Sequence, residues 1–185
     1  MKKIYIIHGW GFDSNSYWIP KLAQQLEDIG FNVITPNMPD TENPTIDKWI
    51  GKLQEIVLDP DSETYFIGHS IGCQTILRYL ESLDNNLKIG GILLVAPWIK
   101  IMGLEPEEEI IANPWLNNAI NFEKVKIRTA NIAAIFSETD PYVYKENEDI
   151  LTKELNAKLY HIGDKKHITE IEDAEYIKNV FNSLI

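Results

Sequence analysis

Short apolar runs that alternate with amphipathic segments constrain the fold of this chain more than any other feature of its sequence. Six runs have the length and the β-rich composition of buried strands, namely residues 3–7, 32–35, 64–67, 89–96, 131–136 and 157–161. Between them apolar residues recur at helical spacing, most regularly at Ile46, Trp49, Ile50, Leu53, Ile56 and Val57. The alternation predicts an α/β fold with a mostly parallel sheet and helices on both of its faces.

The sequence shows no division into separate domains. Its 185 residues contain no internal repeat, low-complexity tract or Gly/Ser linker, so we expect one domain over residues 1–185. The segment from about 98 to 129 breaks the alternation with Pro106, Pro114 and an acidic run. We expect a small helical excursion there, above the strand ends. An ordinary crossover helix with a long loop is the alternative.

The helical stripes near the two ends of the chain give local expectations. Trp18, Leu22, Leu26 and Ile29 predict a first helix that ends at Gly30. The last helix is expected to open with a capping box from Thr169 to Glu172 and to bury Ile171 among its apolar residues.

Charge and composition exclude several classes of protein. Seventeen Lys and Arg against 28 Asp and Glu give a net charge of −11, a field that repels phosphate backbones, so we expect no nucleic-acid partner. The single cysteine, Cys73, excludes an intrachain disulfide and a multi-cysteine metal site. No apolar run approaches the roughly 20 residues that span a bilayer, and the run at 4–7 is too short for a signal peptide. We therefore expect a cytoplasmic protein.

The pentapeptide Gly68-His69-Ser70-Ile71-Gly72 lies where a predicted strand turns into a predicted helix. G-x-S-x-G in this position is typical of a nucleophile elbow, in which a strained turn exposes the serine hydroxyl. Glycine two residues to either side of the serine allows close backbone approach. The alternative is a glycine-rich turn whose serine only caps the helix.

A second glycine-rich loop, His8-Gly9-Trp10-Gly11, follows the first predicted strand. The backbone N–H groups of Trp10 and Ile71 are the candidate oxyanion donors. We expect His8 to organise this loop by hydrogen bonds. The third glycine of a dinucleotide-binding loop is missing, because Ser14 occupies its place.

A nucleophilic serine needs a base, and His167 is the best placed of the four histidines. It lies between the last predicted strand and the last helix, at the sheet edge where the serine is expected. His161 ends a strand, and the side chain of His69 should point away from that of Ser70. The alternative for His167 is a solvated surface histidine.

The acid that would orient this base is expected to be Asp140. It follows the strand at 131–136 and precedes a proline, with Glu138 and Asp164 as rivals; a turn-capping role is its alternative. The resulting chain order of Ser, Asp and His is that of α/β-hydrolases.

These features together resemble a known family. His8-Gly9, residues 68–72, Asp140-Pro141-Tyr142-Val143 and His167 are similar to the small α/β-hydrolases of the retinoblastoma-binding protein 9 and YdeN-like serine hydrolase family, over nearly the whole chain. The resemblance implies a compact α/β-hydrolase fold with a reduced cap, and a triad carried by Ser70, Asp140 and His167. Lys166 departs from the family, whose members often have glycine before the catalytic histidine.

The predicted activity is acyl transfer to water, of the carboxylesterase type, on a small-molecule acyl substrate and without a metal or cofactor. Phe12, Trp98 and Trp115 are candidate walls of an apolar pocket. Thioester, lactone or peptide-bond cleavage at the same site is an alternative. Another is a non-catalytic binding module on a hydrolase fold. The sequence leaves the oligomeric state open.

Overall fold

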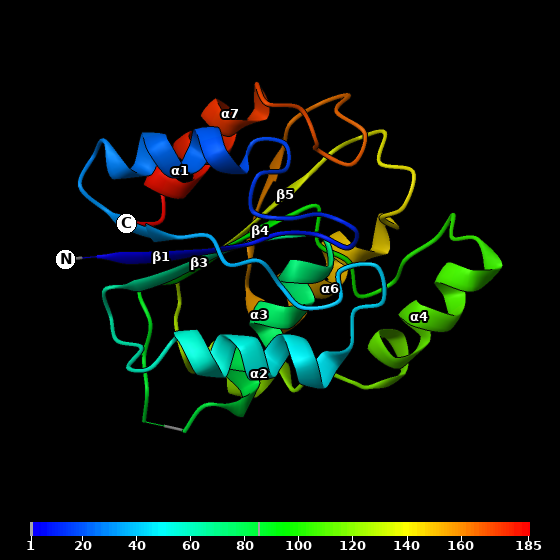
Figure 1. Cartoon of the computed structure of the whole chain (residues 1–185), viewed down its shortest axis with the longest axis horizontal. Helices are drawn as coiled ribbons and strands as arrows, with labels where there is room; N and C mark the ends of the chain where they lie inside the picture. Colours follow the sequence, from blue (N-terminus) through cyan, green and yellow to red (C-terminus); the bar gives the residue numbers. More distant parts are fainter. Residues whose placement is uncertain (1, 85) are drawn as a thin grey trace.

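A single parallel sheet organises the protein, whose computed structural model describes residues 2–84 and 86–185. Its six strands have the order β2-β1-β3-β4-β5-β6 (Figure 1). The strands are β1 Lys3–Ile7, β2 Asn32–Ile34, β3 Thr64–His69, β4 Gly91–Val95, β5 Ile132–Phe136 and β6 Lys158–His161. The predicted α/β fold with a parallel sheet is confirmed, and the predicted strand ends differ by no more than two residues.

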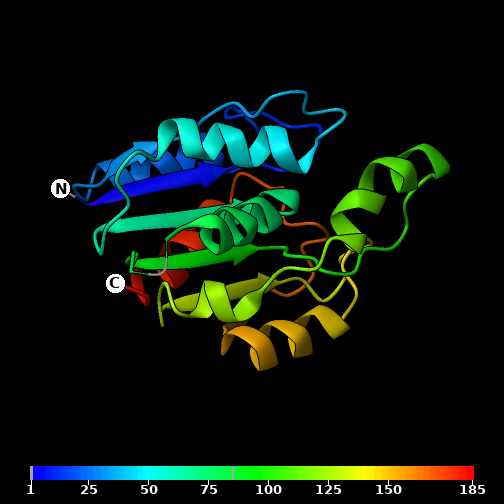
Figure 2. The same cartoon turned by 90° about the horizontal axis from the view of Figure 1, so that it is seen from below.

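Helices cover both faces of the sheet, as predicted. On one face α1 (Ile19–Glu27) packs against α7 (Asp173–Asn182). The other face carries four helices, which are α2 Ile46–Ile56, α3 Ile71–Ser82, α5 Phe122–Lys126 and α6 Glu146–Leu155. The remaining helix, α4 (Pro106–Asn117), lies beyond the carboxyl ends of the strands (Figure 2).

The segment from 98 to 129 combines features of both arrangements considered above. Its first helix, α4, stands off the sheet, whereas α5 packs on α3 and α6 as a crossover helix does. Arg78 of α3 holds the end of α4, because its buried guanidinium donates hydrogen bonds to the carbonyl oxygens of Trp115 and Asn118. The description of the chain as one domain with a small cap stays a prediction.

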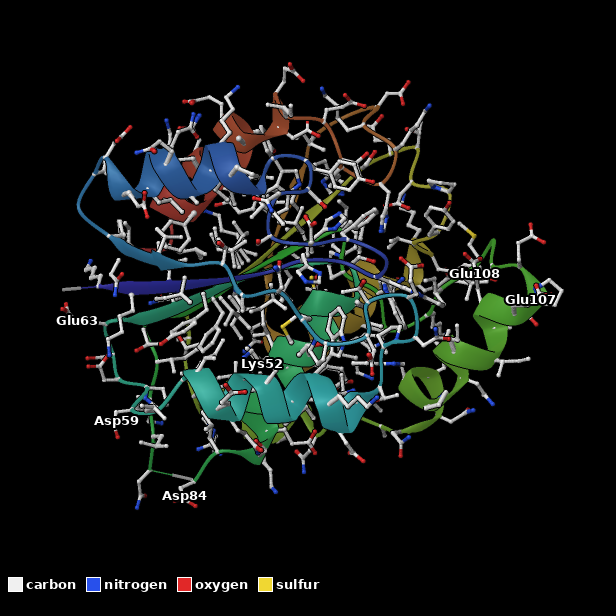
Figure 3. All side chains as sticks on the ribbon, in the orientation of Figure 1. Lys52, Asp59, Glu63, Asp84, Glu107 and Glu108 are labelled. Carbon is white, nitrogen blue, oxygen red and sulfur yellow. The ribbon has the colours of Figure 1, made fainter. Side chains whose placement is uncertain are left out.

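Large apolar side chains fill the space between the sheet and its helices, while charged side chains such as Asp59, Asp84 and Glu107 stand at the rim (Figure 3). Every residue of β3, β4 and β5 is buried, as expected for central parallel strands. No helix among residues 2–84 and 86–185 has the length and apolarity needed to cross a membrane. The cytoplasmic location stays a prediction.

Two expectations about helix ends are wrong. The last helix begins at Asp173, not at Thr169, and Ile171 is 54% exposed. The turn before it is closed by the Asp173 carboxylate, which accepts a hydrogen bond from the Glu170 N–H. At the other end of the chain, Ile29 lies beyond α1 and is 53% exposed. In both places an apolar residue at helical spacing falls outside the regular helix.

Helix α3 is fixed at its carboxyl end by a buried cation. The Arg128 guanidinium donates hydrogen bonds to the carbonyl oxygens of Leu80, Leu83 and Asp84. A cation at this end satisfies carbonyl groups that lack intrahelical partners and complements the helix dipole. Arg128 therefore fixes the end of α3 that lies opposite Ser70.

The strand order reverses between β1 and β3, since β2 lies on one side of β1 and β3 on the other. Parallel α/β sheets bind ligands at such a switch point, beyond the carboxyl ends of the strands. Ser70 directly follows β3, and the loop that contains Trp10 follows β1. The fold thus brings the two predicted glycine-rich segments to one edge.

Close contact between α3 and β1 predicts opposite effects for two glycine substitutions. In Gly72→Ala the new Cβ would collide with the carbonyl oxygens of Ile7 and His8, so we expect the free energy of unfolding to fall by about 1–3 kcal/mol. In the control Gly51→Ala, on the exposed side of α2, a Cβ meets nothing within 4 Å. That change should raise the free energy of unfolding by about 0.5–1 kcal/mol. Urea unfolding of both variants checks the pair; a neutral Gly72→Ala would contradict it.

Candidate active site

Ser70 occupies a strained turn between β3 and α3. Its φ is 54° and its ψ −119°, a conformation that residues other than glycine rarely adopt. The turn is anchored because the Ser70 N–H donates to the Val95 carbonyl at 2.9 Å. A Cβ on Gly68 would come within 2.8 Å of the Cys73 nitrogen, and one on Gly72 would meet backbone oxygen of β1. Both glycines of the motif are therefore required by close packing.

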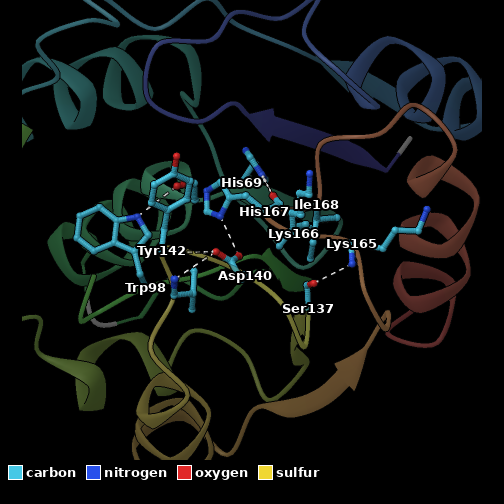
Figure 4. A network of polar contacts seen from close by, with 12 residues as sticks. His69, Trp98, Ser137, Asp140, Tyr142, Lys165, Lys166, His167 and Ile168 are labelled. Carbon is cyan, nitrogen blue, oxygen red and sulfur yellow. Dashed lines mark hydrogen bonds and ion pairs between the residues drawn. The ribbon is translucent and has the colours of Figure 1, made fainter. Parts of the chain in front are cut away.

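Asp140 and His167 form a buried pair. The His167 Nδ1 lies 2.8 Å from the Asp140 Oδ2, and their side chains are 13% and 3% exposed (Figure 4). The other carboxylate oxygen accepts hydrogen bonds from the N–H groups of Tyr142 and Val143, at 2.9 and 3.2 Å. Because an ionised carboxylate only accepts, Nδ1 carries the hydrogen of the imidazole. Nε2 is then the ring nitrogen that can take a proton.

Ser70 and His167 line one pocket of about 230 Å³ at the strand ends. The walls are mainly apolar. Trp10 and Phe12 come from the loop after β1, Ile101 and Leu104 from the segment before α4, and Tyr142 from the loop after β5. Glu42 and Glu108 also line the pocket. The Ser70 hydroxyl oxygen accepts a hydrogen bond from the indole N–H of Trp98 at 3.3 Å.

The loop after β1 is organised by His8, as expected. His8 is fully buried; its Nε2 accepts a hydrogen bond from the Met38 N–H at 2.9 Å. Its Nδ1, which then carries the hydrogen, donates to the Gly9 carbonyl at 2.8 Å. Burial lowers the pKa of His8, which keeps the ring neutral. The loop fixed in this way presents Trp10 at the pocket.

The other candidate oxyanion donor, Ile71, is the first residue of α3. The N–H groups in the first turn of a helix have no intrahelical acceptor, and they point toward ligands at the N-terminus. The structure therefore places a helix N-terminus directly after Ser70. The oxyanion role of Trp10 and Ile71 stays a prediction.

The three aromatic residues predicted as pocket walls have different positions. Phe12 lines the pocket, and Trp98 contacts the serine oxygen itself. Trp115 is not among the lining residues, and we correct that expectation. Its ring is buried between Trp49 and Arg78, and its N–H donates to the Pro44 carbonyl at 3.0 Å. Trp115 belongs to the contact between α2, α3 and α4.

The rival acids and bases lie elsewhere. His161 has a 45% exposed side chain and pairs with Glu148 at 3.1 Å. Asp164 accepts a hydrogen bond from the Thr139 hydroxyl, and Glu138 is exposed. Of the three carboxylates considered, Asp140 is the one that the structure shows hydrogen-bonded to the ring of His167.

The backbone conformation of Lys166 shows why glycine is common at this position in the family that the sequence resembles. Its φ is 47°, in the left-handed region that glycine adopts without steric cost. Glycine before the histidine suits this turn, and here a lysine takes the same conformation. His69 helps to hold this turn through a hydrogen bond to the His167 carbonyl. From the sequence, His69 is only the variable residue of the G-x-S-x-G motif.

His69 is buried among aromatic rings. The rings of Phe12, Tyr17 and Trp18 lie 5.8–6.5 Å from it, and that of His167 lies at 5.0 Å. Burial, with the neighbouring His167 imidazole as the second cause, lowers the pKa of His69 to about 3. The ring is therefore neutral at physiological pH.

Comparison with known proteins shows the family of this chain. Residues 4–183 match the family model described as serine hydrolase. The YdeN gene product of Bacillus subtilis is 28% identical over 183 residues, which cover 99% of this chain and 94% of that protein. Serine hydrolase RBBP9 of Rattus norvegicus is 29% identical over 180 residues, 96% of this chain and 87% of that protein. The resemblance inferred from the sequence is confirmed.

Solved structures share the fold. The crystal structure of the YdeN gene product superposes with a TM-score of 0.89 at 27% identity, covering 100% of this chain and 98% of that one. Est1E of Butyrivibrio proteoclasticus, solved with ferulic acid, gives a TM-score of 0.76 at 17% identity, with 100% and 89% covered. The second likeness concerns the fold alone.

The buried, neutral His69 predicts a loss of stability in acid. Its pKa in the folded protein, about 3, lies below the ordinary value of 6.5, so the unfolded chain binds a proton that the folded one does not. Stability contributed by the neutral ring is lost as the pH falls below that ordinary value. The slope for one such proton is up to about 1.4 kcal/mol per pH unit. Urea unfolding from about pH 6 to about pH 4.5 should give a shallower slope for His69→Gln than for the wild type; equal slopes would contradict this assignment.

Proposed function

The chain belongs to the serine hydrolase family, and from that premise we propose that it cleaves a small ester or a related acyl substrate through an acyl-enzyme on Ser70. One observation carries the proposal. A serine in a strained elbow and a histidine bonded to a buried carboxylate at 2.8 Å line the same pocket. This is the constellation that nucleophilic acyl transfer needs.

In the proposed mechanism the Ser70 oxygen attacks the substrate carbonyl while the Nε2 of His167 takes the hydroxyl proton. Asp140 fixes the ring by accepting from Nδ1 and stabilises the imidazolium that forms. His167 then gives the proton to the leaving alkoxide. In the second half, His167 activates a water that attacks the acyl carbon and releases the acid and free Ser70.

The negative charge on the tetrahedral intermediate needs donors that are already oriented. The backbone N–H groups of Ile71 and Trp10 have this role in the proposal, and the N-terminus of α3 adds its positive dipole end. Loss of one such donor typically costs about 10²–10³ in rate. Trp98 holds the Ser70 oxygen through its indole N–H in the resting protein, which leaves the hydroxyl hydrogen available for His167.

The pocket supports a small acyl group. Its volume of about 230 Å³ is below the roughly 300–1,000 Å³ of pockets for drug-sized ligands. Apolar walls favour an uncharged acyl chain, while Glu42 and Glu108 disfavour strongly anionic substrates. Thioesters, lactones and amides present the same carbonyl to Ser70, so a panel of these against simple esters would rank the leaving groups.

Labelling by a fluorophosphonate tests the nucleophile without knowledge of the substrate. We expect a single stoichiometric adduct on the wild type, because an activated serine attacks phosphorus as it attacks a carbonyl carbon. Intact mass and peptide mapping would place the adduct on Ser70, and Ser70→Ala should remain unlabelled. A folded wild-type protein that forms no adduct would favour the non-catalytic binding module.

The assignment of the base predicts unequal effects for two histidines. His167→Ala should lower kcat/KM for a small p-nitrophenyl ester by about 10²–10⁴, the usual contribution of a positioned general base. His161→Ala is the matched control, because that side chain is largely exposed and pairs with Glu148 away from Ser70. Steady-state kinetics of the two variants would check this. A larger loss in His161→Ala would overturn the assignment.

A further inference from the structure

The backbone on both sides of His167 is strained. Lys166 has a φ of 47° and Ile168 a φ of 55°, so two non-glycine residues in the left-handed region enclose the proposed base. The conformation costs about 1–2 kcal/mol per residue and is least favourable for a β-branched side chain such as isoleucine. Such a turn persists only where its surroundings hold it.

Two buried ring N–H groups hold this turn by hydrogen bonds to the carbonyl oxygens of two consecutive residues. The Nε2 of His69 lies 2.9 Å from the His167 carbonyl oxygen, and the Nε1 of Trp18 lies 3.0 Å from that of Ile168. Both rings are 1% exposed. Figure 4 shows His69 beside the backbone of His167, with Ile168 next along the loop. We call these two donors the His167 clamp.

The chemistry of the His69 contact fixes the state of its ring. A carbonyl oxygen only accepts hydrogen bonds, so Nε2 must carry the hydrogen. The aromatic cage excludes water, which keeps the ring neutral. A neutral donor holds the carbonyl without placing a second positive charge beside the imidazolium that forms on His167 during the proposed reaction.

His69 links the proposed base to the proposed nucleophile because of its place in the chain. His69 is the last residue of β3 and is followed directly by Ser70. Its ring therefore ties the backbone of the proposed base to the strand that carries the proposed nucleophile. Trp18 adds a second tie from the start of α1.

We propose that His69, supported by Trp18, is a positioning residue that sets the location of His167 relative to Ser70 through hydrogen bonds to the backbone of the strained loop. This role rests on the proposed function, because it acts only through the transfer of a proton from Ser70 to His167. A positioning role differs from general support of the fold. Loss of the clamp should lower the reactivity of Ser70 only in a protein that still contains His167.

Two pairs of variants separate the hydrogen bond from the packing. His69→Gln keeps an N–H donor near the position of Nε2, whereas His69→Leu fills the space without a donor. Trp18→Phe removes the indole donor and keeps an aromatic ring. Trp115→Phe is its matched control, because that indole also donates to a backbone carbonyl at 3.0 Å but lies outside the pocket.

The measurement is the second-order rate constant for labelling of Ser70 by a fluorophosphonate, followed by intact mass. We expect His69→Leu to slow labelling by roughly 10- to 100-fold, the effect of misplacing a reacting group by about 1 Å. His69→Gln should stay closer to the wild type than to His69→Leu. Trp18→Phe should slow labelling more than Trp115→Phe does.

A second background tests whether the effect passes through His167. In His167→Ala, adding His69→Leu should change the residual labelling rate by less than about twofold, since a residue that acts only by positioning the base has nothing left to position. An equal fold-loss in both backgrounds, or a His69→Gln variant as slow as His69→Leu, would overturn the proposal.

An unfolded variant and an unreactive wild-type protein give different results in this experiment. Thermal unfolding of each variant reports whether it is folded before labelling. If His69→Leu does not fold, the comparison of Trp18→Phe with Trp115→Phe decides, and equal rates overturn the proposal. A folded wild-type protein that is not labelled at all would instead overturn the proposed function, and the positioning role with it.

Discussion

The contact between the start of α3 and the end of β1 is the constraint on which the site depends. Gly72 lies so close to the Ile7 and His8 carbonyls that no larger residue fits without a shift. This approach forces the chain to turn sharply between β3 and α3, and Ser70 takes up the turn with a positive φ. The same approach puts the N-terminus of α3 beside the loop after β1. Arg128 holds the far end of the helix through three carbonyls, so that α3 is fixed at both ends.

Backbone groups orient two polar side chains that support the pocket, those of Asp140 and His8. Asp140 accepts from two backbone N–H groups in addition to His167, and His8 bonds to one backbone N–H and one carbonyl. Hydrogen bonds of this kind depend on the course of the chain and not on mobile side chains. Donors and acceptors that are fixed before the substrate arrives need little reorganisation during a reaction, which is the main source of electrostatic catalysis. The geometry of the site is therefore a property of the fold as a whole.

Much of this arrangement could be predicted from the sequence, because local patterns encode it. The period of apolar residues gave the strands and the stripe of α2, and the spacing of two glycines about Ser70 gave the elbow. Long-range contacts could not be predicted in the same way. Trp115 has the composition of a pocket wall but packs on Trp49, and Ile171 has helical spacing but precedes the helix. The partner of His69 lies 98 residues away in the chain, so no local pattern indicates it.

Part of the backbone strain in this protein lies where the proposed chemistry takes place. Among the described non-glycine residues with a positive φ, Ser70, Ala96, Lys166 and Ile168 all follow strands at the carboxyl edge of the sheet. Each costs stability that the surrounding core must offset. The turn at Ser70 and the turn around His167 are joined through the ring of His69, which bonds to the His167 carbonyl. Glycine at position 166 would adopt the same φ without steric cost. Both proposed reacting groups lie in strained turns with the buried, neutral ring of His69 between them, which is the physical argument that their relative position matters for the proposed reaction.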